Sequence, residues 1–233
     1  MRLTILGAYG PFPGPNGGCS SYLIEDGDTR ILLDCGSGSL GRLRAVFPES
    51  LSLDAIVLSH MHTDHAGELD LFRYMVEFGQ LKAPLKVLSP DTDRLHYAAF
   101  DPVETHDGMQ VEIGSLTLRF TAVRHAVPTM GVRITGEDGS SLFYTGDTGW
   151  FDGLVDAAQD AGMLLADACL RDESNAKALK NHMTVAQVLA LRQKANCEIA
   201  ILTHLYFDGT PYPPIIDRQA FYAVEGGRFE TRE

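Results

Sequence analysis

The sequence predicts an α/β protein built as a four-layer αββα sandwich, in which two sheets face each other and helices cover the outside. The first observation is a predicted β-hairpin: Asp26-Gly27-Asp28 has the composition of a tight turn and joins two β-rich runs, residues 21–25 and 29–34. The second is that each half of the chain runs from strands to helices. Hairpins dominating the strand connections favour paired sheets over a doubly wound parallel sheet.

The first half begins with an apolar strand that breaks into a loop, because prolines and glycines crowd residues 11–18 and exclude regular structure there. Further on, Leu69, Phe72, Met75, Val76 and Phe78 recur at helical spacing, so this helix is expected to pack through that face. The predicted strands cover residues 3–7, 21–25, 29–34, 56–58 and 85–88, and the predicted helices cover residues 40–47, 69–78 and 92–100.

The second half repeats the pattern with longer β-rich runs. Gly114-Ser115 and the segment 137–140 supply turns between neighbouring strands, and Thr184 is a plausible N-cap. The predicted strands cover residues 109–113, 116–125, 131–135, 141–145, 163–169 and 198–202, and the predicted helices cover residues 151–161 and 184–195.

Length and charge narrow the class of protein. A chain of 233 residues without a linker-like stretch is expected to form one domain over 1–233. Its formal net charge of −12 argues against a broad nucleic-acid-binding or anionic-membrane surface, so an anionic substrate would have to be captured locally. The first residues lack the apolar length of a signal peptide and no run approaches a membrane span, which makes the cytoplasm the expected location.

The four cysteines are expected to be buried thiols. Cys19, Cys35, Cys169 and Cys197 show no CxxC spacing, so the sequence indicates neither a zinc ribbon nor a redox motif. A chain of this size needs no disulfide to fold.

The chemistry is concentrated in the stretch from Ser59 to Leu69. His60, His62, Asp64 and His65 follow the apolar run 54–58 directly. Side chains two residues apart in extended chain share a face, so His60 and His62 point one way, while the following turn aims Asp64 and His65 at a second position. The alternative is a solvated histidine-rich loop. We expect two adjacent metal sites, because a hydrated loop has no reason for this spacing.

Three further polar residues each lie just past a predicted strand. His125 follows residues 116–124, Asp147 follows residues 142–146, and His204 follows residues 198–203. Ligands at strand ends can converge on one sheet edge, and imidazole and carboxylate suit a divalent metal.

These residues resemble the metallo-β-lactamase fold superfamily, in particular its ribonuclease Z-like branch. The segment from His60 to His65 is similar to the HxHxDH motif of that fold, and the later positions match the branch in order and context. The matching segments are Leu33-Asp34-Cys35-Gly36, Arg124-His125, Thr145-Gly146-Asp147, Asn181-His182-Met183 and Thr203-His204.

The resemblance implies two divalent metal ions, with zinc expected and manganese or iron left open by the N/O ligands. A hydroxide bridging the two metals would be the nucleophile, and Asp147 would bridge them as a ligand. The implied ligands are His60, His62 and His125 for one metal and Asp64, His65 and His204 for the other.

The resemblance also implies catalytic residues, namely Asp64, His182 and Asp167. His182 is a candidate acid that protonates the leaving group. The alternative is a helix-entry histidine that only binds the backbone. Asp167 stands where the branch usually has Glu and would orient His182. Asp34 resembles a carboxylate that fixes a ligand imidazole, whereas His96 and His106 lie outside every motif.

The implied function is a dinuclear zinc-dependent phosphodiesterase whose substrate is a small phosphodiester or an RNA 3′ end. The interval from His125 to Asp147 spans only 147 − 125 = 22 positions, whereas tRNA-processing ribonuclease Z enzymes carry a tRNA-gripping arm there. Arg171, Lys177 and Lys180 form the best basic cluster nearby, with a solvated charged helix as the alternative reading.

Other functions stay open at this point. They are tRNA 3′ processing by an endoribonuclease, hydrolysis of carboxylesters or lactones, and a non-enzymatic metal-binding interaction module. A flavodiiron redox protein is disfavoured because its pattern has Glu where this chain has His62. The sequence leaves the oligomeric state open, a homodimer included.

Overall fold

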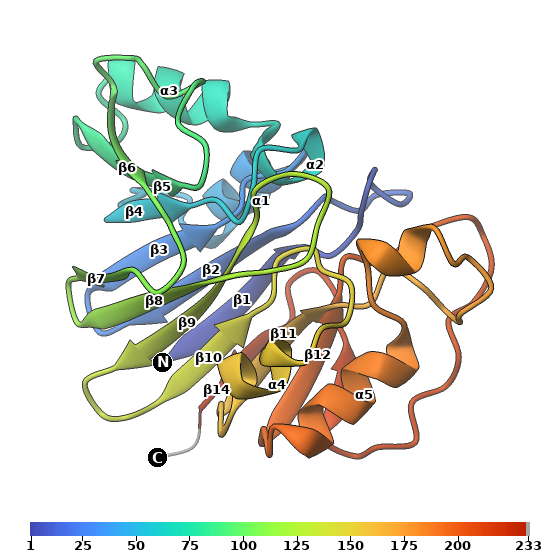
Figure 1. The fold of residues 1–233 in the computed structure, drawn as a ribbon. Helices are drawn as coiled ribbons and strands as arrows, with labels where there is room; N and C mark the ends of the chain where they lie inside the picture. Colours follow the sequence, from blue (N-terminus) through green and yellow to red (C-terminus); the bar gives the residue numbers. More distant parts are fainter. Residues whose placement is uncertain (232–233) are drawn as a thin grey trace.

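The computed structural model describes residues 1–231 and shows two seven-stranded sheets lying face to face (Figure 1). The first sheet is antiparallel from β14 to β3 and parallel from β3 to β6. In spatial order its strands are β14 (Arg228–Glu230), β1 (Arg2–Gly7), β2 (Ser21–Asp26), β3 (Thr29–Leu33), β4 (Ala55–Val57), β5 (Leu85–Ser89) and β6 (Phe100–Glu104).

The second sheet has the same plan, parallel from β13 to β10 and antiparallel from β10 to β7. In spatial order its strands are β13 (Ala220–Tyr222), β12 (Ile199–Thr203), β11 (Met163–Asp167), β10 (Ser141–Tyr144), β9 (Met130–Gly136), β8 (Leu116–Ala122) and β7 (Gln110–Ile113). The expectation that hairpins dominate is therefore wrong for half of each sheet, where helices or loops make the crossovers.

Helices cover both outer faces, which completes the predicted αββα sandwich. The first sheet carries α1 (Ser39–Val46), α2 (Thr63–Ala66) and α3 (Leu69–Glu77), and the second carries α4 (Gly153–Ala158), α5 (Val185–Lys194) and the 3₁₀ turn η1 (Ala178–Lys180). None of the helices in residues 1–231 is long and apolar enough to cross a membrane.

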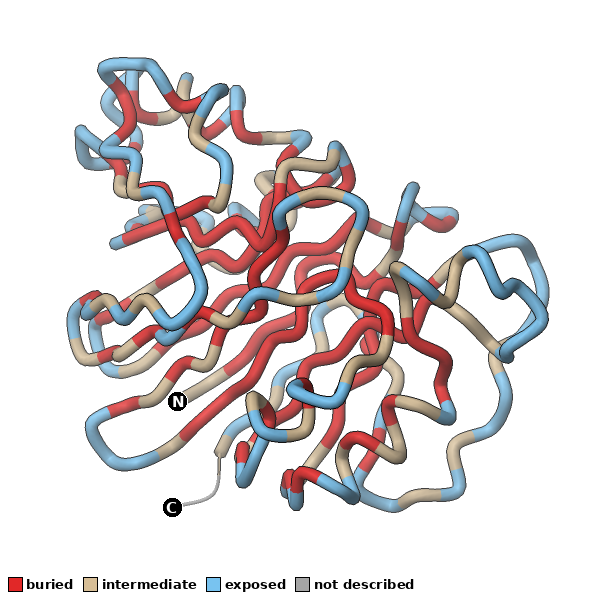
Figure 2. Tube along the Cα trace, in the orientation of Figure 1, coloured by how far each residue is buried: buried red, intermediate tan, exposed pale blue. Residues whose placement is uncertain are grey.

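Alternation along the strands explains the layers. Ile5 of β1 points into the core between the sheets, whereas its neighbour Leu6 packs under the helices on the other face. In β11, Leu165 and Leu164 divide in the same way between the central core and the α4–α5 side. The inner strands are therefore buried on both faces, as the colouring in Figure 2 shows, whereas the edge strands β6, β7, β13 and β14 are partly exposed.

A capping motif fixes where helix α5 begins. Thr184 is the N-cap of α5, as predicted, and its side chain accepts a hydrogen bond from the Gln187 backbone N–H at 3.2 Å. The Gln187 side chain in turn accepts from the Thr184 N–H at 2.9 Å, which forms a capping box. This fixes the chain two residues after His182.

Two local expectations are wrong. The predicted helix at 92–100 is absent and residues 92–99 form turns, because the Asp91 side chain accepts from the Asp93 N–H at 2.9 Å and competes with helical hydrogen bonding. Phe100 instead begins the edge strand β6. Phe78 is 78% exposed and does not belong to the packed face of α3. The cysteines are buried and free, as expected.

Candidate metal centre

All predicted ligands meet where the strands end between the two sheets. His60 and His62 lie in the loop after β4, with His62 as the residue before α2, and Asp64 and His65 lie within α2. His125, Asp147 and His204 follow β8, β10 and β12 respectively. Their donor atoms form two adjacent groups: His60, His62 and His125, and Asp64, His65, Asp147 and His204.

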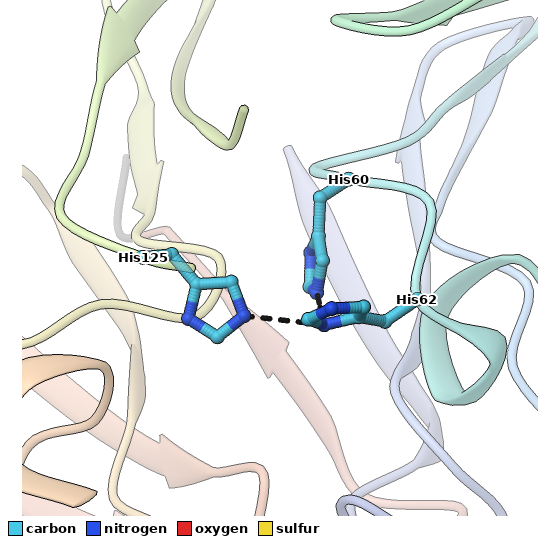
Figure 3. Close-up of side chains that lie close together, drawn as sticks. All are labelled: His60, His62 and His125. Atoms are coloured by element: carbon cyan, nitrogen blue, oxygen red, sulfur yellow. Dashed lines mark hydrogen bonds between the residues drawn. The ribbon is translucent and has the colours of Figure 1, made fainter. Parts of the chain in front are cut away.

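In the first group three imidazoles converge on one point (Figure 3). His60 Nε2 lies 2.9 Å from His62 Nδ1, and His125 Nε2 lies 3.2 Å from the same atom. Ligand nitrogens on a tetrahedral zinc, each about 2.1 Å from the metal, stand roughly 3.4 Å apart. The observed spacing is therefore close to what a shared metal requires.

Contacts on the far side of two rings fix which nitrogen carries the proton. His125 Nδ1 faces the Asn181 carbonyl oxygen at 3.2 Å, and because a carbonyl only accepts, Nδ1 must donate and Nε2 keeps its lone pair. Ser59 Oγ donates to Asp34 at 2.9 Å and so accepts from His60 Nδ1 at 3.0 Å. Both Nε2 lone pairs are thus left for a metal.

The second group surrounds two buried carboxylates. His204 Nε2 lies 3.1 Å from Asp64 Oδ2 and 3.2 Å from Asp147 Oδ2, and His65 Nε2 lies 3.2 Å from Asp147 Oδ1. Asp147 Oδ2 also lies 3.8 Å from His60 Nε2 and 3.9 Å from His125 Nε2. Within residues 1–231, Asp147 is therefore the carboxylate that faces both groups, the residue to which the resemblance gave the bridging role.

Asp34 holds this half of the centre in place. It accepts hydrogen bonds from His65 Nδ1 at 2.8 Å, from Tyr144 Oη at 2.6 Å and from the Ser59 N–H at 2.7 Å. The His65 contact leaves Nε2 of that ring facing Asp147, and Nε2 is the atom that would bind a metal. Tyr144 is a site residue that sequence reasoning missed, because nothing in a β-rich run marks which tyrosine will reach a carboxylate.

The donor set fits metal ions. His65 Nε2 and Asp147 Oδ1 are buried and have no hydrogen-bond partner within residues 1–231, which is costly unless something else satisfies them. Burial lowers the pKa of His60 well below its usual value and also lowers the pKa of His125, whereas the charges of Asp147 and Asp34 outweigh burial and raise the pKa of His65, so a metal would have to displace a proton from that ring. Neutral imidazoles are the form that binds metal.

Backbone strain is present at the same place. His204 has φ +54° and Asp34 has φ +55°, a left-handed region that residues other than glycine rarely adopt. Such conformations cost on the order of 1–3 kcal/mol each and persist where the surroundings hold them, most often at functional sites.

His182 stands beside the second group, and with Asp167 it lies close enough to Asp147 and His204 for these four residues to form a further possible metal-binding group. The Nδ1 of His182 lies 2.9 Å from Asp167 Oδ2, so the shorter Asp in the place of Glu still reaches the ring. Burial lowers the pKa of His182, but the charge and hydrogen bond of Asp167 outweigh burial and raise the pKa to about 9. With Nδ1 committed to Asp167, Nε2 is the atom free to exchange a proton.

Cys169 lies beside the centre, although no motif in the sequence marked it. Its Sγ lies within 4.8 Å of a nitrogen of both His182 and His204. Burial, followed by the charges of Asp167 and Asp147, raises the pKa of the Cys169 thiol strongly. This environment favours the protonated thiol in the metal-free chain, whereas a metal ligand would be the thiolate.

Gly10 is a second residue that the sequence did not single out. A Cβ added at Gly10 would stand 2.0 Å from His204 Nε2, so the backbone packs directly against the ligand imidazole. Gly10→Ala should displace His204 and lower metal content by up to one equivalent per chain, measured by elemental analysis. Gly41→Ala is the matched control, since nothing lies within 4 Å of a Cβ there. Full metal content in Gly10→Ala would contradict the expected displacement of His204.

Arg171 is not a free cation. Its guanidinium donates to both Asp208 carboxylate oxygens, at 2.8 and 3.2 Å, and to the carbonyls of Tyr206 and Thr210 at 3.0 and 2.7 Å. It also lies 4.5 Å from the centre of the Tyr212 ring. Arg171 therefore holds the loop after His204, and of the predicted basic cluster only Lys177 and Lys180 remain exposed.

Comparison with known proteins agrees with this geometry. Residues 29–205 match the family model described as beta-lactamase superfamily domain. The chain is 29% identical over 216 residues to the probable metallo-hydrolase YhfI of Bacillus subtilis, covering 88% of this chain and 87% of that protein. It is 28% identical over 272 residues to ribonuclease Z of Mycobacterium marinum, covering 99% and 95%.

Solved structures show the same fold. The crystal structure of YhfI superposes with a TM-score of 0.83 at 23% identity, covering 98% of each chain. A diphosphatase from the PhnP family superposes with a TM-score of 0.76 at 18% identity, covering 99% of this chain and 98% of that one. The chain therefore belongs to the beta-lactamase superfamily, with the metallo-β-lactamase fold and a His/Asp donor set able to bind metal ions.

Proposed function

We propose that this chain is a metal-dependent phosphodiesterase with two metal ions, zinc being the expected one. The observation that carries the proposal is that the donor atoms form two adjacent groups and that Asp147 faces both. Relatives named metallo-hydrolase and ribonuclease Z, and the structural neighbour named diphosphatase, support hydrolysis at a phosphorus centre.

The chain's residues would divide the work as follows. His60, His62 and His125 would hold one metal, Asp64, His65 and His204 the other, and Asp147 both. When bound, such metals supply a nucleophile from water at neutral pH and neutralise charge on the phosphoryl oxygens. Asp34 keeps the His65 ring in its metal-binding tautomer, and Ser59 relays the same constraint to His60.

His182 would donate a proton to the leaving oxygen. Asp167, 1% exposed, keeps the proton on Nδ1 and the ring in one orientation, and the side chain of His182 stays 20% exposed while those of His60 and His65 are fully buried. An accessible, oriented imidazole next to buried ligands suits a general acid. Asp167 would act on the substrate only through His182 and is a positioning residue.

We propose a small phosphodiester as the preferred substrate. The interval between His125 and Asp147 holds only β9, β10 and their turns, which leaves no arm to grip tRNA there. The guanidinium of Arg171 is occupied, and the formal net charge is −12. Binding of a long polyanion needs many Lys and Arg contacts, whereas a small phosphodiester needs little besides the metals.

A salt series tests this substrate preference. Catalytic efficiency on bis(p-nitrophenyl) phosphate should vary less than about 3-fold between 50 and 200 mM salt, because few ions are released on binding. Efficiency on precursor tRNA should be low throughout. Efficient, site-specific 3′ cleavage of precursor tRNA at physiological salt would instead make tRNA maturation the function. A lactone in the same panel tests carbonyl esters, and faster lactone than phosphodiester hydrolysis would contradict the reaction class.

A further inference from the structure

Resting on the proposed phosphodiesterase function, we propose that Phe12 and Phe207 form a stacking platform for the base of a nucleotidyl substrate. We call this platform, together with the rings of Tyr9 and Tyr206 behind it, the aromatic rim. None of its residues belongs to the two donor groups. Its place beside the second ligand group makes it a candidate for selecting what is attached to the phosphodiester.

The rim adjoins the metal centre through the backbone. Gly10, two residues before Phe12, packs against the His204 imidazole, and Phe207 lies three residues after His204. The Gly10 N–H donates to the Leu205 carbonyl at 3.3 Å, and Tyr9 and Leu205 form a parallel β-bridge. The two loops therefore run side by side at His204, and Phe12 and Phe207 follow this contact by two and three residues along the chain.

The rings are arranged to leave contact surface open. Phe12 meets Tyr206 at 5.6 Å between ring centres with planes 64° apart, and Tyr9 meets Phe207 at 6.3 Å and 87°. In such edge-to-face pairs a ring is held without a partner stacked over its whole face. Phe12 remains 47% exposed and Phe207 41% exposed.

Both loops are held in place, so the exposed rings do not result from unanchored chain. Arg42 donates to the Asn16 carbonyl at 2.7 Å, and a Cβ at Gly17 would stand 2.5 Å from the Tyr9 ring, which shows how closely the loop wraps that side chain. Arg171 fixes the other loop through Tyr206 and Asp208. Two buttressed loops can offer rings without an ordering cost on binding.

The chemistry of the ligand follows from what surrounds the rim. Because Arg171 is committed to its loop and the chain is strongly acidic, the organic part of the substrate has few cations to bind it here. A nucleobase needs none, since every base presents a π-face, and stacking on aromatic side chains is tolerant of sequence. A nucleoside attached to the phosphorus therefore fits the rim better than a bare alkyl group.

Two substrates with one leaving group test the proposal. Thymidine 5′-(p-nitrophenyl phosphate) carries a base, whereas ethyl p-nitrophenyl phosphate does not, and both release p-nitrophenolate. Phe12→Ala and Phe207→Ala should each raise KM for the thymidine ester by about 10-fold, the range expected for one lost stacking contact. KM for the ethyl ester should stay unchanged. Phe12→Tyr and Phe207→Tyr should restore the wild-type values.

Phe78→Ala is the matched control, because Phe78 is an equally apolar ring, 78% exposed, directly after α3 and outside the rim. Single-stranded RNA as a third substrate distinguishes a small nucleotide from the end of a nucleic acid as the ligand of the rim. A KM effect confined to the thymidine ester assigns the rim to small nucleotides, and an effect on RNA as well assigns it to nucleic-acid ends.

Failure of the stacking platform can be distinguished from failure of the phosphodiesterase function. If the wild-type chain hydrolyses neither ester, the phosphodiesterase function is wrong and the stacking platform with it. If it hydrolyses both, and the alanine variants change neither KM or change both equally, the function stands and the platform is refuted.

Discussion

Asp147→Ala is expected to empty both metal sites and abolish hydrolysis. The carboxylate lies 3.2 Å from both His65 and His204 and within 3.9 Å of His125, so its loss removes a donor from each group at once. Because metal catalysis supplies several kcal/mol of transition-state stabilisation, catalytic efficiency should fall on the order of 10³-fold or more. Elemental analysis and a phosphodiester assay measure the two effects.

Asp93→Ala is the control for this variant, since Asp93 is exposed and lies in the 92–100 turn region away from the ligands. The circular dichroism spectrum of Asp147→Ala should match that of the parent, which distinguishes loss of metal from loss of fold. Retention of both metals by a folded Asp147→Ala chain would rule out a shared carboxylate.

His182→Ala should lower turnover by ~10²–10⁴-fold with metal content intact, the usual range for a lost general acid. The physical reason is that His182 contacts Asp167 at 2.9 Å and lies outside the seven proposed ligands. The loss should shrink for p-nitrophenyl esters, because p-nitrophenolate leaves almost without protonation. An equal loss on good and poor leaving groups would remove the acid role.

Two further variants sharpen this test. Asp167→Asn keeps the size of the side chain but no longer favours the same His182 tautomer, so it should reproduce part of the loss and the same dependence on the leaving group. His96→Ala changes an exposed histidine that lies outside every motif and should leave turnover unchanged.

The layered fold and the convergence of the candidate ligands could be predicted largely from local pattern, whereas the division of the ligands between two metals came from the family resemblance. Strand alternation placed Ile5 and Leu6 on opposite faces, and strand ends carried His125, Asp147 and His204 to one edge. Thr184 could be predicted as the N-cap of the following helix. Each of these signals is written within a few neighbouring residues, where propensity and periodicity apply.

What could not be predicted depends on residues far apart in the chain. Tyr144 reaches Asp34 across 110 positions, Gly10 packs against His204, and Cys169 joins His182 only after folding. The helix predicted for residues 92–100 is absent for a different reason, since the Asp91 side chain accepts a local backbone hydrogen bond in place of the helical pattern. The strands β13 and β14 were missed because three residues give too short a pattern.

The most direct test of the two-metal centre is the metal content of the native chain. Protein prepared without chelators, saturated with zinc and freed of excess ion should contain two equivalents per chain by elemental analysis. Two equivalents are expected because the ligand atoms form two donor groups and Asp147 faces both. A content that saturates at one equivalent or less would contradict the dinuclear centre on which the proposed chemistry depends.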